Sequence, residues 1–133
     1  MDDNTIQMEK RSGHKHYTLR DHERYTVDFL LENGYKPQII PASNITGVKT
    51  PDLLLDGVPW EMKSVTKAST KTIERSFGHE LKQAPNLIYD LRNLKIDEAE
   101  QALRMLQWCI KKFRQAKHLM VITKNGQLLK LSK

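Results

Sequence analysis

The sequence predicts a mixed α/β fold, in which a mixed β-sheet is flanked by helices. Stretches whose apolar residues recur every three or four positions alternate with short apolar runs of strand length. Asp56-Gly57 and Asn125-Gly126 each separate two such short runs, and these dipeptides are strong signals of a tight hairpin. Helices that cover a sheet bury both kinds of apolar face, so this architecture suits the observed alternation.

The expected elements follow the order helix, three strands, helix, strand, helix, two strands. The first helix is bounded by a cap at Thr18 and by Gly34, and the second ends before Pro85. The third helix begins at a cap formed by Asp97 and Glu100. The expected ranges are 19–33, 70–83 and 97–117 for the helices, and 36–41, 52–55, 58–65, 86–91, 118–123 and 127–131 for the strands.

Length and composition indicate one folded domain. A chain of 133 residues has room for one hydrophobic core, and its 38% hydrophobic and 29% charged residues are typical of globular proteins. We expect residues 1–17 to form a flexible lead-in and residues 18–133 to form the domain. No apolar run approaches the ~20 residues that span a bilayer. The single cysteine, Cys109, excludes an internal disulfide.

The net charge of +6 is unevenly distributed along the chain. Residues 1–64 contain 8 basic and 10 acidic side chains, whereas residues 65–133 contain 14 basic and 6 acidic ones. An acidic half with candidate metal ligands, followed by a basic half, suits a protein that holds a polyanion near a cation. A basic surface in contact only with solvent gives the same balance, so charge supports a nucleic-acid partner without establishing one.

The hairpin around Asp56-Gly57 carries the candidate chemistry. If these two residues form the loop, Asp52 faces Glu61 on the neighbouring strand. Side chains alternate between the two faces of a strand, so Asp52, Glu61 and Lys63 share one face. The opposite face is apolar and should pack on the core. That face comprises Leu53, Leu55, Val58, Trp60 and Met62.

Two opposed carboxylates predict a divalent-cation site at Asp52 and Glu61. Opposed residues have Cβ atoms ~4.5–5.5 Å apart, where like charges are destabilising unless a cation separates them. Mg²⁺ takes oxygen ligands, commonly one or two carboxylates together with water and substrate phosphate, so we expect Mg²⁺, with Mn²⁺ as the other candidate. Lys63 would contact the scissile phosphate, position the attacking water or stabilise developing negative charge. The alternative is a surface hairpin in which Lys63 merely offsets two acids.

The same residues resemble a known nuclease signature. Thr50-Pro51-Asp52 followed by Trp60-Glu61-Met62-Lys63 is similar to the motif of the PD-(D/E)xK nucleases, and the element order over residues 19–91 resembles their core. More narrowly, the chain resembles the C-terminal tRNase toxin domain of contact-dependent growth inhibition (CdiA) proteins. The segments that carry this second resemblance are His22-Glu23, Asn33-Gly34-Tyr35, Lys49-Thr50-Pro51-Asp52, Asp56-Gly57, Trp60-Glu61-Met62-Lys63 and Gln83-Ala84.

The resemblance implies a restriction-endonuclease-like fold and a metal-dependent endonuclease. In such an enzyme Asp52 and Glu61 would bind the metal, and Lys63 would assist phosphodiester hydrolysis. The family often places a further acid on the first helix. Glu23 is the candidate, because it shares a helical face with apolar residues four and seven positions further on. The alternative for Glu23 is an acid that only favours the helix N-terminus.

The resemblance also implies which residues contact substrate and which partners the chain has. The second helix would flank the active site, so Lys67, Arg75 and Gln83 are candidate substrate-binding residues, although a solvated helix face is the alternative. The implied substrate is nucleic acid, specifically tRNA, and the implied protein partner is a cognate immunity protein. The chain would act in the cytoplasm of a target cell after delivery as part of a larger secreted chain. A DNA endonuclease of the same fold and an inactive nucleic-acid-binding module are the rival functions.

Overall fold

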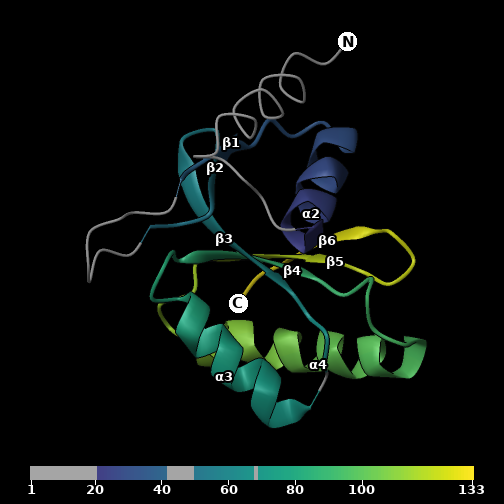
Figure 1. The fold of residues 1–133 in the computed structure, drawn as a ribbon. Helices are drawn as coiled ribbons and strands as arrows, with labels where there is room; N and C mark the ends of the chain where they lie inside the picture. The colour runs from purple at the N-terminus through teal and green to yellow at the C-terminus, as the bar shows by residue number, and fades with distance from the viewer. Residues whose placement is uncertain (1–20, 42–49, 68) are drawn as a thin grey trace.

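The computed structural model describes residues 21–41, 50–67 and 69–133 (Figure 1). Its helices are α2 (Asp21–Glu32), α3 (Thr70–Glu80) and α4 (Ile96–Lys112), and its strands are β1 (Gln38–Ile39), β2 (Leu53–Leu55), β3 (Val58–Ser64), β4 (Asn86–Asp90), β5 (His118–Ile122) and β6 (Leu128–Leu131). This order is the predicted one. The predicted lead-in and the predicted cap at Thr18 lie outside the described residues, so both stay predictions.

Within the described residues, the six strands form one mixed sheet in the order β1-β2-β3-β4-β5-β6. The pairs β1–β2, β2–β3 and β5–β6 are antiparallel, whereas β3–β4 and β4–β5 are parallel. Each parallel pair is connected through a helix, α3 for the first and α4 for the second, because parallel neighbours need a crossover connection. The predicted fold class, a mixed sheet flanked by helices, is confirmed.

The helices cover both faces of the sheet and create two apolar layers. Helix α2 lies on one face, and α3 and α4 lie together on the other (Figure 1). The central strand β4 contributes to both layers, since Ile88 belongs to the α2 layer while Leu87 and Tyr89 belong to the α3–α4 layer. All five residues of β4 are buried.

Several elements are shorter than predicted. Strand β1 has two residues rather than six, because Pro37 and Pro41 flank it and neither carries an N–H for the ladder.

The predicted cap at Asp97 is wrong: α4 begins at Ile96, and the backbone N–H of the capping residue Lys95 donates to Glu98 Oε1 at 3.4 Å.

Helices α3 and α4 also end earlier than predicted. Helix α4 stops at Lys112 because Phe113 adopts an extended backbone, with φ −87° and ψ 109°. Helix α3 stops at Glu80 and is followed by a turn, so Gln83 lies beyond the helix. The N-cap of α3 is Ser69, whose side chain accepts a hydrogen bond from the Thr72 N–H.

The hairpin between β2 and β3 forms with the predicted register. Asp56 and Gly57 have φ values of 50° and 79°, the left-handed pair that a two-residue type I′ turn requires. The pairing is Leu53↔Trp60, Leu54↔Pro59 and Leu55↔Val58. Of the predicted apolar face, Val58 is wrong: it is 41% exposed, because it directly follows the turn at the tip of the hairpin.

Candidate active site

Asp52 and Glu61 are held face to face by the hairpin. Asp52 directly precedes β2, and the register places it opposite Glu61 in β3. The backbone N–H of Asp52 donates to Glu61 Oε1 at 3.1 Å, and the backbone N–H of Met62 donates to Asp52 Oδ2 at 2.8 Å. Each carboxylate therefore accepts a hydrogen bond from the backbone of the opposite chain segment, which orients both side chains toward the same place.

The environment of these two carboxyl groups disfavours negative charge. The pKa of Asp52 is raised to about 6, mainly by burial and also by the charges of Glu23 and Glu80, against the opposing effect of the Met62 hydrogen bond. The pKa of Glu61 is raised to about 9, mainly by burial, and also by the charge of Asp52 and by a hydrogen bond to Glu80. A hard divalent cation fits this pair, because its ligands are oxygens and its charge would offset the repulsion.

Glu80 is an acid at this site that sequence reasoning missed. It is the last residue of α3 and is only 8% exposed. Its carboxyl group is hydrogen-bonded to that of Glu61, and its charge also raises the pKa of Asp52. A signal was present in the sequence, because Glu80 follows the buried Ile73 and Phe77 at helical offsets of seven and three. We call Asp52, Glu61 and Glu80 the acid cluster.

Glu23 lies on α2, the helix that covers the face of the sheet opposite to α3 and α4 (Figure 1). It is half-buried, and it shares its helical face with Val27 and Leu30, which are fully buried as the predicted face requires. Its negative charge raises the pKa of Asp52, so its carboxylate lies within electrostatic reach of the acid cluster. Direct metal ligation by Glu23 stays a prediction.

In residues 21–41, 50–67 and 69–133, no three His, Cys, Asp or Glu side chains converge tightly enough to hold a metal ion by themselves. A cation at the acid cluster would therefore be held by the pair Asp52 and Glu61. Mg²⁺ commonly binds proteins in this way, with water and substrate phosphate as its remaining ligands.

Lys63 lies two residues after Glu61 on β3 and is half-buried. It lines a pocket of about 120 Å³ together with Lys67, so the structure brings these two predicted residues together. Gln83 lies in the turn after α3, where its backbone N–H donates to the Glu80 carbonyl at 2.9 Å. Arg75 is exposed and lines a different hollow beside Phe113, away from Lys63.

A buried ion pair fixes α2 to the end of β4. Asp90 is 1% exposed and pairs with Arg92 at 2.7 Å. Thr26 of α2 donates to the same carboxylate at 2.9 Å, and Arg92 also donates to the Tyr25 carbonyl at 3.1 Å. This network holds the helix that carries Glu23 against the sheet.

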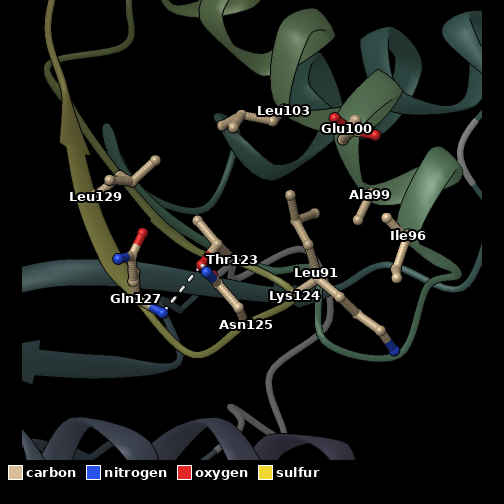
Figure 2. Close-up of a pocket in the computed structure, with 10 residues that line it drawn as sticks. All are labelled: Leu91, Ile96, Ala99, Glu100, Leu103, Thr123, Lys124, Asn125, Gln127 and Leu129. Carbon is tan, nitrogen blue, oxygen red and sulfur yellow. Dashed lines mark hydrogen bonds between the residues drawn. The ribbon is translucent and has the colours of Figure 1, made fainter.

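A larger concavity of about 410 Å³ lies elsewhere, between the first half of α4 and the β5–β6 turn. Figure 2 shows the side chains of Leu91, Ile96, Leu103 and Leu129 around it, with the backbone N–H of Gln127 bonded to Thr123 Oγ1. No member of the acid cluster lines this concavity, so the concavity is separate from the candidate active site.

Of the helices α2, α3 and α4 in the described ranges, none combines the length and hydrophobicity that a membrane-crossing helix needs.

Comparison with known proteins identifies the family of the chain. The chain is similar in structure to a chain of the CdiA-CT/CdiI toxin and immunity complex from Burkholderia pseudomallei, with a TM-score of 0.62 and 16% sequence identity over 82% of this chain and 80% of that one. At this identity the likeness shows a shared fold. No curated protein matches the chain. The family model of the contact-dependent growth inhibition CdiA C-terminal domain matches residues 49–128, more than half of the chain and the whole of the segment from Asp52 to Glu80. The chain therefore belongs to the family of contact-dependent growth inhibition CdiA C-terminal domains.

Proposed function

We propose that this chain is a toxin domain that hydrolyses phosphodiester bonds in nucleic acid with the help of a divalent ion, in the manner of PD-(D/E)xK nucleases. The observation that carries the proposal is the Asp52–Glu61 pair, whose two acids face each other across the hairpin with raised pKa values. Lys63 follows on the same strand face. A pair of carboxylates in this arrangement is unfavourable without a cation, and a solvated surface hairpin offers no reason to keep it.

Each residue has a distinct role in the proposed reaction. Asp52 and Glu61 hold the ion, preferably Mg²⁺, with Mn²⁺ as the alternative. When bound, such an ion supplies Lewis-acid stabilisation of the phosphate. The ammonium group of Lys63 offsets negative charge that develops on the phosphate and orients the attacking water. Glu23 and Glu80 add negative charge around the site, which increases its attraction for a cation.

The proposed substrate is RNA, and tRNA in particular. The basic second half of the chain suits a polyanionic partner. The choice of tRNA rests on the resemblance to tRNase toxin domains, and DNA is the rival substrate. An inactive nucleic-acid-binding module is the rival from another functional class.

The proposed protein partner is a cognate immunity protein. The solved structure that the chain resembles is that of a toxin and immunity complex. In this proposal the domain is delivered as part of a larger secreted chain and acts in the cytoplasm of the target cell.

The first experiment is a cleavage assay on total tRNA and, separately, on plasmid DNA, each with Mg²⁺ or with EDTA. Wild type is compared with Lys63→Ala and with Lys36→Ala, which removes an exposed lysine beside β1. Cleavage that needs Mg²⁺, is lost in Lys63→Ala and persists in Lys36→Ala would support the nuclease and select its substrate. Salt-sensitive binding without cleavage under any divalent ion would favour the binding module.

A second experiment addresses the metal ligands independently of activity. Mg²⁺ should raise the thermal unfolding midpoint of wild type, because a ligand that binds only the folded state stabilises it. This shift should disappear in Asp52→Ala and persist in Asp97→Ala, which removes an exposed acid from α4. Unchanged cleavage by Asp52→Ala would contradict the site assignment.

A further inference from the structure

A small pocket opens beside Lys63, between the end of β3 and the first turns of α3. Its volume is about 120 Å³, and its polar lining residues are Lys63, Ser64, Thr66, Lys67, Thr72 and Ser76. The buried side chains of Val65 and Ile73 complete the wall. The pocket therefore combines two ammonium groups and four hydroxyls above an apolar base, and no carboxylate lines it.

The positive charge of this pocket is not neutralised by its protein neighbours. In the part of the chain that the structure describes, neither Lys63 nor Lys67 forms an ion pair. Two acids on elements that border the pocket are already paired elsewhere. Asp90, opposite Ser64 in the sheet register, is bound by Arg92, and Glu74 of α3 pairs with Lys112.

Two of the four hydroxyl groups are arranged to donate to a ligand, whereas Ser76 Oγ already donates to the Ile73 carbonyl at 3.1 Å. Ser64 Oγ accepts a hydrogen bond of 3.1 Å from Asn93 Nδ2, which leaves its own proton for another acceptor. Thr72 Oγ1 accepts from Ser69 Oγ, with the same consequence. Ammonium and hydroxyl donors without a competing carboxylate suit the oxygens of a phosphate. Helix α3 begins at the pocket and has no acid in its first turn, so its N-terminus adds favourable potential.

We infer that this pocket binds a backbone phosphate of the nucleic acid, next to the phosphate that lies at the acid cluster. The position relative to the acid cluster rests on the proposed function, whereas phosphate binding itself does not. Lys63 lies ~6.6 Å beyond Glu61 along the strand, at ~3.3 Å per residue, and lines the pocket. A strand that places one phosphate at the acid cluster would therefore pass its neighbour to the pocket.

Matched lysine variants test phosphate binding without cleavage. Lys67 and Lys71 are both exposed, but only Lys67 lines the pocket, and Lys71 lies in the separate hollow beside Phe113. The affinity of the chain for a short single-stranded RNA is measured in EDTA over a range of salt concentrations. Lys67→Gln should weaken binding and reduce the slope of log affinity against log salt by about 0.7, as expected for a single phosphate contact on a single strand. Lys71→Gln, with the same change of charge, should leave the slope at its wild-type value.

A neutral linkage identifies the phosphate that is bound. Each RNA of a series carries one methylphosphonate at a different position. At one of these positions the neutral linkage should weaken binding by wild type and leave binding by Lys67→Gln unchanged. Thr72→Val, which removes a hydroxyl and keeps the shape, should weaken binding of the unmodified RNA and become silent at the same linkage. Equal effects of Lys67→Gln and Lys71→Gln, or full additivity at every linkage, would overturn the pocket assignment.

These outcomes are separable from the fate of the proposed nuclease. Inorganic phosphate should shift the amide resonances of Lys67 and Thr72 in wild type even if no nucleic acid is cleaved. Cleavage that persists while the two lysine variants bind alike would keep the nuclease and reject the pocket. If cleavage occurs, Lys67→Gln should raise KM and leave kcat unchanged, because a contact with a neighbouring phosphate binds ground state and transition state alike.

Discussion

The backbone N–H of Asp52 donates a 3.1 Å hydrogen bond to Oε1 of Glu61, so the carboxyl group of each residue is fixed next to the other. The Met62 N–H holds the Asp52 carboxylate in the same way. These bonds orient two acids whose raised pKa values show that they resist ionisation. The hairpin therefore maintains an arrangement that the metal-free protein does not favour electrostatically.

The stability of the metal-free chain should fall as pH rises. The pKa of Asp52 rises from 3.8 to about 6 on folding and that of Glu61 from 4.5 to about 9. A raised carboxyl pKa means that the folded state binds its proton more tightly. The stabilisation is fully present below the unfolded values and is lost as pH rises through about 6 and then about 9. Thermal unfolding in EDTA, from about pH 5 to about pH 9, measures this loss.

Glu61→Gln should remove most of this pH dependence. The unfolding midpoint of the variant should exceed that of wild type by a margin that grows toward pH 9, because Gln cannot ionise. Glu100→Gln, which neutralises an exposed acid on α4, should run parallel to wild type. Parallel curves for Glu61→Gln and wild type would show that Glu61 ionises as readily in the folded chain as in the unfolded one.

Glu80→Gln should lower the pKa of Glu61. The variant removes a negative charge and changes the hydrogen bond, both of which raise the Glu61 pKa in wild type. The measurement is the titration of the Glu61 side-chain carboxyl by ¹³C NMR in metal-free solution. The midpoint should fall below the wild-type value of about 9, whereas Glu32→Gln, at the exposed end of α2, should not move it. An unchanged midpoint in Glu80→Gln would remove Glu80 from the acid cluster.

Gly57→Ala should destabilise the hairpin by ~1 kcal/mol, because Gly57 has φ 79° and a side chain disfavours that backbone conformation. The space around Gly57 is open, so the loss would come from the backbone and not from a clash. Asp56→Asn should be nearly neutral, since Asn tolerates the left-handed region. Denaturant unfolding midpoints compare the two variants, and equal midpoints would argue against the type I′ turn.

Asp90→Ala should cost ~3–5 kcal/mol of unfolding free energy, because it leaves Arg92 partly buried without its partner. Glu74→Ala breaks the more exposed pair with Lys112 and should cost ~1 kcal/mol or less. Denaturant unfolding of both variants measures this contrast. Similar losses for the two pairs would mean that the Asp90 network contributes little to holding α2.

Local sequence signals predicted the order of the helices and strands and two of the three residues of the acid cluster. The Asp56-Gly57 turn fixes the register by itself, so the opposition of Asp52 and Glu61 followed from counting residues away from it. Helical spacing likewise placed Glu23 on the buried side of α2. In both cases the determining interactions lie within ten residues along the chain.

Long-range contacts explain what the sequence did not reveal. The bond from Thr26 to Asp90 joins residues 64 positions apart, and no local pattern distinguishes Asp90 from a solvated strand-end acid. Glu80 depends on the packing of α3 against β3, which turns an acid at the end of a helix into a buried neighbour of Glu61. The length of β1 depends on two prolines, whose missing donors matter only once the partner strand is known.

The complete burial of β4 has a consequence for how the protein opens. Amide hydrogens of β4 should exchange with solvent most slowly, through global unfolding, because both faces and both edges of this strand are covered. The hairpin that carries Asp52 lies at the outer end of the same sheet, bordered by a strand of only two residues. Its amides should exchange through smaller, more frequent openings that leave β4 intact. Local opening of the hairpin would then rearrange Asp52 and Glu61, while β4 and the core around it stay folded.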